Sequence, residues 1–275
     1  MKPFVIAVLV MGLLPQDKQD KGEAKRGATD DAKSKAEAAQ RLAFMKASLA
    51  VYEVYSGTDR KTKLALHPEP LLRWNNPVSS VPDGAVFMWT ANGRPEIGMQ
   101  VFIAAGTTDL WLHEFQSLSR GTFSLERDGQ PVWHPHKAGV EFKPAPDAPE
   151  PAKTEVGRLQ QMRAIAETFT AADDFEGKSR WELRLLSKPL HRYGKPDTEI
   201  LDGALFAFVH GTDPEVWLLV EARSTDRGHA WQYALAPMTG YAVQVSRKGQ
   251  AVCSCPWRKP PFDPREPFFI CQYKP

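Results

Sequence analysis

Hydrophobic residues recur at helical spacing in two segments of the chain. The first segment is RLAFMKASLAVYEVY, which begins at Arg41, and Gly57 ends its pattern. The second is RLQQMRAIAETFTA, which begins at Arg158 and repeats the apolar steps of the first 117 positions later. Apolar residues three and four positions apart lie on one face of a helix. The apolar positions are Leu42, Met45, Leu49 and Tyr52 in one segment and Leu159, Met162, Ala166 and Phe169 in the other.

Short runs typical of β-strands follow each predicted helix. After the second helix they are WELRLL, ALFAFVH, EVWLLVEAR, WQYALA, YAVQVSR and QAVCS. The run from Tyr241 alternates apolar and polar residues, as a strand with one buried face does. ALFAFV is apolar on both faces, so we expect it in the middle of a sheet that is covered on both sides. One helix followed by about five hairpin-linked strands predicts an α+β unit with the helix on an antiparallel sheet, cystatin-like or NTF2-like in outline.

The pattern occurs twice in the same order. PLLRWNNPVSSVPDGAVF from Pro70 matches PLHRYGKPDTEILDGALF from Pro189, and RDGQPV matches RKGQAV. The offset between matching residues grows from 117 to 120, as small loop insertions would cause. We therefore predict two tandem repeats, 41–133 and 158–253, whose sheets pack as a pseudo-symmetric pair. The cleft between them is the expected ligand surface.

The segments outside the repeats differ in composition. Residues 1–15 resemble a signal peptide, because Lys2 precedes an apolar run of about 11 residues, too short to span a bilayer. This predicts export to the periplasm or beyond, although no small-residue cleavage box follows. Residues 16–40 form a charged tether, and 134–157 a Pro-rich linker. The tail 254–275 has too many prolines for regular structure, and we expect its aromatic residues to pack across the surface.

Composition excludes some partners. The chain has 275 residues, of which 42% are hydrophobic and 25% charged, an ordinary globular mixture. The net charge is only +2, which argues against nucleic acid or an anionic membrane as partner. No residue pattern calls for a cofactor, and no segment is predicted to cross a membrane.

The cysteines predict one disulfide in an exported protein. Cys271 is expected to pair with Cys253 or Cys255, which leaves one thiol over. Direct pairing of Cys253 with Cys255 would strain the bond geometry. The CSC sequence has no second ligand pair, so it is a weak metal signal.

Catalytic candidates are few, because familiar catalytic motifs are missing from the sequence. Residues shared by both repeats, such as Asp202 before its glycine, are typical of turns and scaffold. A single active site should instead appear where the repeats differ. His210 matches Ala91 and His191 matches Leu72. His210, His191 and Asp202 are therefore candidates for a hydrolase-type acid–base site, although nothing in the sequence supplies a nucleophile.

Two further sets of residues are candidates for binding. His134 and His136 in HPH are metal candidates, with a solvated linker as the simpler interpretation. Trp89 and Trp217 lack a tryptophan partner in the other repeat. If exposed, they would stack on sugar rings or on an apolar partner; if buried, they are core residues.

Several phrases together resemble a family. They are RLxxM, PLLRW with PLHRY, the two DGA segments, and HGTDPE. Over about residues 40 to 255 the chain resembles uncharacterised exported tandem-repeat proteins of planctomycete-type bacteria. The resemblance implies export and a repeated architecture, and it transfers no catalytic residue.

The sequence thus predicts an exported, non-catalytic binding or interaction protein of the cell envelope. An envelope protein, a glycan or a small molecule is the expected partner. The alternatives are a hydrolase-type enzyme with one His/Asp site in the second repeat, and a carbohydrate-binding protein.

Overall fold

The computed structural model describes residues 20–57, 59–104, 106–107, 109–175, 177–195 and 198–273, with side chains from residue 33 onward. The chain divides into two units, Met1–Ala43 and Phe44–Pro275. The predicted signal-like segment 1–15 lies outside the described residues. Where it is described, the predicted tether 16–40 is helical, because helix α1 spans Asp20–Leu49.

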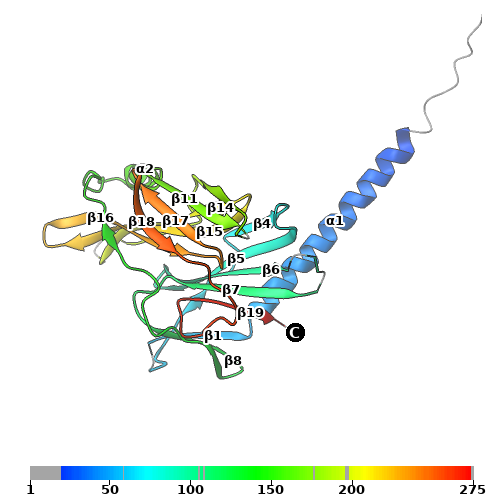
Figure 1. The fold of residues 1–275 in the computed structure, drawn as a ribbon, viewed down its shortest axis with the longest axis horizontal. Coiled ribbons are helices and arrows are strands. Elements are labelled where there is room, and N and C mark those ends of the chain that lie inside the picture. The colour runs from blue at the N-terminus through cyan, green and yellow to red at the C-terminus, as the bar shows by residue number, and fades with distance from the viewer. Residues whose placement is uncertain are drawn as a thin grey trace, which may run out of the picture. The chain divides into compact units, whose positions relative to one another are not determined.

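The second unit consists mainly of β-strands (Figure 1). The described residues contain nineteen strands, and after α1 one further helix, α2 (Glu155–Ala166). In the first half the strands are β1 (Tyr52–Ser56), β2 (Thr62–Lys63), β3 (Ala65–Leu66), β4 (Leu72–Asn76), β5 (Val81–Ala91), β6 (Arg94–Ile103), β7 (Trp111–Ser117), β8 (Phe123–Arg127) and β9 (Gln130–Trp133). The remaining strands are β10 (Lys143–Pro144), β11 (Phe169–Phe175), β12 (Ser179–Leu185), β13 (His191–Tyr193), β14 (Ile200–His210), β15 (Asp213–Thr225), β16 (Gly228–Pro237), β17 (Val243–Arg247), β18 (Gln250–Cys255) and β19 (Phe268–Tyr273).

The predicted α+β class, with two helix-on-sheet units of the cystatin or NTF2 type, is wrong. Strands make up 51% of the structure, in several large antiparallel sheets that include a half-barrel. The predicted helices also end earlier than their apolar periodicity indicated, because Tyr52 and Phe169 are the first residues of β1 and β11. Aromatic and β-branched residues favour an extended backbone, and here that preference prevails over the helical spacing.

Three antiparallel sheets make up the strand structure. The first has the order β2-β1-β8-β9, and the second β19-β7-β6-β5-β3 with β4 on β5. The third and largest has the order β10-β16-β15-β14-β12-β11-β17-β18, with β13 on β14. Below, "the six-stranded sheet" contains β5, β6 and β7, and "the nine-stranded sheet" contains β14, β15 and β16.

Strand pairings follow the same order in the two halves. β5, β6 and β7 pair in succession, as do β14, β15 and β16, while β1 pairs with β8 as β11 does with β17. The hairpins β5–β6 and β14–β15 share their register, since Ala91 lies opposite Arg94 and His210 opposite Asp213. The duplication itself stays a prediction, since the halves do not form the separate units that we expected.

Segments expected to lack regular structure contribute strands. β10, in the predicted linker, extends the nine-stranded sheet by pairing with β16. β19, in the predicted tail, pairs with β7 over six residues. No proline occurs between Pro267 and Tyr273, and the segment FFICQY has the β-forming residues of a strand.

The six-stranded and nine-stranded sheets pack face to face. One shared core contains Trp74, Val86 and Met88 from the first half, and Leu205, Trp217 and Leu219 from the second. At Gly98 of β6, a Cβ atom would lie 1.3 Å from the Trp217 ring, so only glycine leaves room for the indole. The other face of the nine-stranded sheet packs against α2, through Met162, Ile165 and Ala166.

Candidate functional site

The three predicted acid–base residues are not brought together. Asp202 and His210 lie eight residues apart on β14, which separates them by about 26 Å. The Asp202 carboxylate accepts hydrogen bonds from Arg158 Nε (2.7 Å) and from Arg192 Nε and Nη2 (2.9 and 2.6 Å). Arg158 belongs to α2, so this ion pair anchors the helix on the sheet.

His191 lies elsewhere on the same sheet. Its Nε2 is 2.9 Å from the carbonyl oxygen of Gly93, and its ring stacks on Tyr193. Burial lowers the pKa of this imidazole. The site predicted from His210, His191 and Asp202 is therefore not formed.

The two tryptophan candidates are core residues. Trp89 is 2% exposed and Trp217 is 0% exposed, so neither offers a face to a sugar ring. His134 and His136 have ring centroids 5.5 Å apart. They belong to no group of three metal-ligating residues within the described chain.

The predicted disulfide is absent, since Cys253, Cys255 and Cys271 are all free thiols. Cys271 lies on β19, opposite His113 of the six-stranded sheet. The other two thiols lie on β18, a strand of the nine-stranded sheet.

His210 has a different acidic partner, Asp173 of β11. Its Nδ1 lies 2.9 Å from Asp173 Oδ2, and both residues are buried, at 3% and 2% exposure. The imidazole also lies against Phe175 and Trp181, each with its ring centroid 4.9 Å from that of His210. β14 is the strand that brings the histidine to the Asp173 end of the sheet.

Two more carboxyl groups follow immediately in the chain. Asp213 and Glu215 open β15, and both line the cavity described below. A ligand atom of Glu215 lies within 4.8 Å of one from Asp173 and one from His210. Thus three strands, β11, β14 and β15, bring an imidazole and two carboxylates together.

The six-stranded sheet adds Glu114 to the group. Glu114 of β7 is buried, and its Oε2 accepts a hydrogen bond from Gln100 Nε2 at 3.3 Å. The same amide nitrogen donates to the carbonyl oxygen of Pro214 at 2.9 Å, so Gln100 links the two sheets at the site. We call Glu114, Asp173, Asp213 and Glu215 the acidic cluster.

Every member of the acidic cluster has a raised pKa. Burial is the largest cause for each of them, because it removes water from the charged form. Neighbouring carboxylates raise the pKa further: Glu215 does so for Glu114, Glu114 for Asp213, and Asp213 for Glu215. Each of these carboxyl groups therefore releases its proton less readily than an exposed carboxyl group does.

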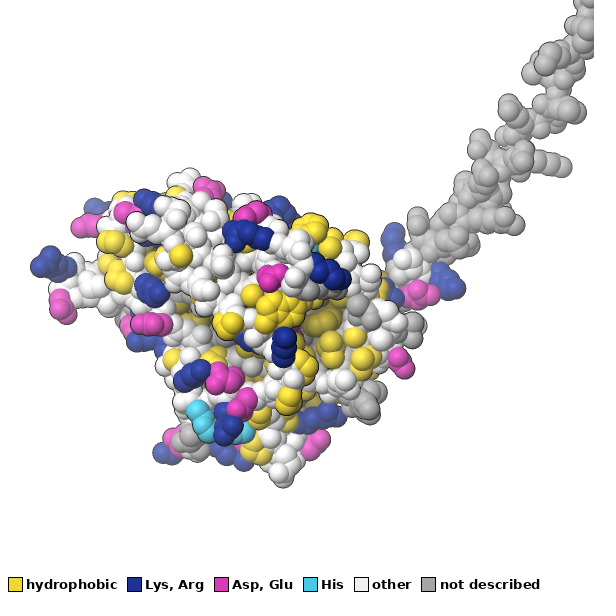
Figure 2. Space-filling view, viewed as in Figure 1, with side chains coloured by type: hydrophobic (Ala, Val, Ile, Leu, Met, Phe, Trp, Pro, Cys, Tyr) yellow, Lys and Arg dark blue, Asp and Glu magenta, His cyan; other side chains and the backbone are white. Residues whose placement is uncertain are grey.

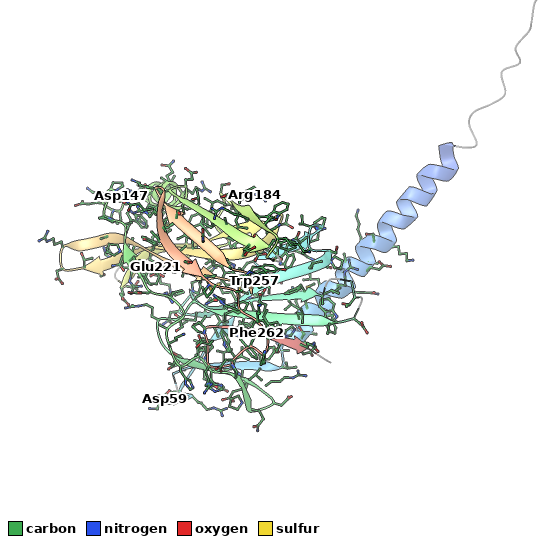
Figure 3. The ribbon with its side chains drawn as sticks, in the orientation of Figure 1. Asp59, Asp147, Arg184, Glu221, Trp257 and Phe262 are labelled. Carbon is green, nitrogen blue, oxygen red and sulfur yellow. The ribbon has the colours of Figure 1, made fainter. Side chains whose placement is uncertain are left out.

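A cavity of about 320 Å³ opens onto the acidic cluster. Glu114, Asp213 and Glu215 line it, and Phe175, Tyr241 and Trp257 form an aromatic wall. Figure 3 shows Trp257 between the two sheets in this view. On the face of the molecule seen in Figure 2, apolar side chains gather near the centre and charged ones surround them. The remaining lining residues are Asn76, Ser79, Val81, Phe102, Ala104, Leu112, Thr239, Gly240, Arg258 and Ile270.

Among the described residues that line the cavity, Arg258 is the only basic one. Its Nε and Nη2 lie 3.2 and 2.9 Å from Cys255 Sγ, and its Nη1 donates to the carbonyl oxygen of Pro237. The guanidinium also stacks on Phe268, at 4.3 Å from the ring centroid. These contacts hold Arg258 against β16, β18 and the tail, and its charge partly offsets the rise in the pKa of Glu114.

In the β5–β6 hairpin, the equivalent hairpin of the first half, an arginine balances the charge of the carboxyl groups. At the position of Asp213 it has Arg94, which lies 2.8 Å from Glu96 and 3.0 Å from Glu221. Ala91 replaces His210 there. The excess of carboxyl groups is therefore specific to the β14–β15 hairpin.

The sequence contained part of this site. HGTDPE differs from ANGRPE both at His210 and at Asp213, and the second difference exchanges a cation for an anion. We singled out the histidine and missed the aspartate. Asp173 and Glu114 carry no such signal, because only the packing of β7 and β11 brings them to the hairpin.

Comparisons of the chain with protein-family models, with curated proteins and with solved structures return no match. Within the described residues, no helix has both the length and the apolar character that crossing a membrane requires.

Proposed function

We propose that the protein is a binding protein whose cavity takes a small organic cation, such as a substituted ammonium group. The observation that carries this proposal is the joint presence of three carboxyl groups and an aromatic wall in one cavity. The cavity volume, about 320 Å³, lies at the lower end of the range for small-molecule sites.

Charge supports a positive ligand. Buried carboxylates without a countercharge are costly, so each tends to take up a proton or a cation. The lining has three carboxyl groups and one guanidinium, and Arg258 is held by Cys255 and Pro237. A cationic ligand would therefore lower the energy of the site, and an anion would be repelled.

The aromatic wall supports an organic cation in particular. Tyr241 has its ring centroid 5.2 Å from that of Phe175 and 5.0 Å from that of Trp257, so the three rings form a continuous surface. Ammonium groups are attracted to aromatic faces, by roughly 0.5–2 kcal/mol per contact. Carboxylates opposite such a surface would pair with the charge while the rings cover its alkyl groups.

The test compares two ligands of the same shape. Choline and its uncharged isostere 3,3-dimethylbutan-1-ol would each be titrated into the full chain by calorimetry. We expect choline to bind about tenfold more tightly, which corresponds to about 1.4 kcal/mol. Tyr241→Leu removes an aromatic face of the wall and should weaken choline binding about fivefold.

Tyr55→Leu is the matched control, because Tyr55 lies on β1 and does not line the cavity. It should leave choline binding unchanged. Equal affinity for the two ligands, or an equal effect of both substitutions, would contradict the proposal.

We also propose that the protein works in the cell envelope. The support is the apolar run Phe4–Leu14 after Lys2. Fractionation of expressing cells, with mass spectrometry of the N-terminus, should recover the chain outside the cytoplasm; recovery in the cytoplasm alone would contradict export.

A further inference from the structure

We infer that Asp173, His210 and Glu215 form a binding site for a divalent transition-metal cation of the zinc type. This site goes beyond the proposed function. Its ligand is an inorganic ion, and Asp173 and His210 do not line the cavity in which we place the organic cation.

The donor set suits such an ion. One ligand atom from each of the three residues lies within 4.8 Å of the others. An imidazole nitrogen with carboxylate oxygens is a ligand combination that zinc and neighbouring transition metals accept. Calcium prefers about six to eight oxygen ligands and magnesium retains several waters, so a site with one nitrogen and few ligands disfavours both.

Unpartnered buried atoms are independent support for a ligand. Asp173 Oδ1 and His210 Nε2 are buried and have no hydrogen-bond partner among the described residues. Both residues are more than nine-tenths buried. Polar atoms that are buried without a partner are rare and costly, and they often indicate a missing ion or water. A cation bound at the Asp173 carboxylate would supply the partner that Oδ1 lacks.

Two of the ligands already face one another. His210 Nδ1 lies 2.9 Å from Asp173 Oδ2, a spacing at which both atoms can contact one ion of the zinc type. Preset orientations reduce the entropy that binding a metal ion would cost.

Charge and access agree with a metal ion. With a neutral histidine, Asp173 and Glu215 together balance the two charges of the cation. Glu215 also belongs to the cavity lining, so a cation can reach the site from the cavity. Three protein ligands leave a further coordination position for water.

The matching positions in the first half of the chain retain only one of the three potential metal ligands. Ser56 matches Asp173 in strand register, and Ala91 matches His210. Only Glu96 matches Glu215, and Arg94 pairs with it. Within the described residues, no other group of three potential ligands is found.

The experiment uses the full chain after chelator treatment and dialysis. Zinc would be titrated in competition with a chromophoric chelator, and calcium and magnesium in parallel. We expect one tight zinc site per chain, with calcium and magnesium at least about 100-fold weaker. Zinc should also raise the Tm of the wild-type protein.

Variants locate the site. His210→Gln should weaken zinc binding at least about 100-fold, since even outer partners of metal ligands contribute 10–100-fold. His229→Gln, at a histidine on β16 outside the cluster, should bind zinc as the wild type does. If His210→Gln does not fold, Glu215→Gln replaces it, because the amide has the shape of the carboxyl group.

Two outcomes would overturn the inference. One is failure of the folded wild-type chain to bind zinc at micromolar concentration; the other is zinc binding by folded His210→Gln or Glu215→Gln at wild-type affinity. The second would place zinc elsewhere, for example at His134 and His136. Titrating choline into the same samples tests the proposed function independently of the zinc site. Tyr241→Leu should weaken choline binding and leave zinc binding intact.

Discussion

Asp213 and Arg94 occupy the same position in two hairpins of identical register. Arg94 joins Glu96 and Glu221 in a buried ion-pair network. Asp213 instead adds a carboxyl group to Glu114 and Glu215. One difference in charge therefore distinguishes a self-neutralised junction from one with an excess of carboxyl groups. We expect Asp213→Arg to abolish choline binding in the calorimetric titration while the protein remains folded.

A second buried titratable residue predicts the pH dependence of stability. His113 is 0% exposed, and its ring nitrogens contact Ser48 Oγ (3.1 Å) and Tyr52 Oη (2.9 Å). Its pKa is lowered to about 3, mainly by burial and then by Arg127. Around it also lie Tyr273, which stacks on the ring, and Cys271, opposite it on β19.

The sign follows from comparing the two states. An unfolded histidine takes up a proton near pH 6.5, whereas folded His113 resists protonation down to about pH 3. Its contribution to stability is therefore complete above pH 6.5 and falls by about 1.4 kcal/mol per pH unit below it. Between pH 7 and 4.5 the wild type should lose about 2.7 kcal/mol more than His113→Gln does.

Urea unfolding of both proteins at the two pH values measures this difference. Glutamine can retain a hydrogen bond to Tyr52 or Ser48 and does not titrate. Equal pH dependence of the wild type and His113→Gln would mean that the folded imidazole titrates normally.

At the scale of elements, the packing of β6 against β15 gives a specific prediction. A methyl group at Gly98 would lie 1.3 Å from the Trp217 ring. Gly98→Ala should therefore destabilise the protein by about 3 kcal/mol, the upper end of the usual overpacking cost. In a Trp217→Leu background the same substitution should cost at least about 1 kcal/mol less.

Gly121→Ala is the control for this cycle. Nothing lies within 4 Å of a Cβ atom at Gly121, so its effect should stay within about 0.5 kcal/mol. Additive effects of Gly98→Ala and Trp217→Leu would show that the two residues do not interlock.

Individual elements could be predicted where local pattern and environment agree. ALFAFVH and EVWLLVEAR form β14 and β15, and their apolar character on both faces matches their place in the middle of a sheet. The helix ends could not be predicted from spacing alone. Tyr52 and Phe169 continue the helical period, yet they begin strands because pairing with β8 and β17 decides their backbone.

At the scale of the whole molecule, the sequence could not show which surface covers each strand. Both faces of β14 are buried, one by α2 and its neighbours and the other by the six-stranded sheet. The prediction of a helix on each sheet gave too much weight to two short periodic segments. The sequence also could not show whether Trp89 and Trp217 are exposed. They are buried in the core because the two sheets pack face to face, so neither side chain can contact a sugar.

The candidate site could be predicted from the sequence only in part. His210 could be found as a difference between matching segments, but its partner Asp173 could not. β11 and β14 are separated in the sheet order by β12, so their side chains meet only after the nine-stranded sheet has formed.

Strand β19 also has a consequence for the timing of biosynthesis. The six-stranded sheet takes this strand from residues Phe268–Tyr273, whereas its neighbour β7 ends at Ser117. At a translation rate of about 5–20 residues per second, the edge of β7 stays uncovered for roughly 10 to 30 seconds. An unpaired strand edge is prone to join other chains. We therefore expect the edge of β7 to remain open to pairing with other chains until residues Phe268–Tyr273 have been synthesised.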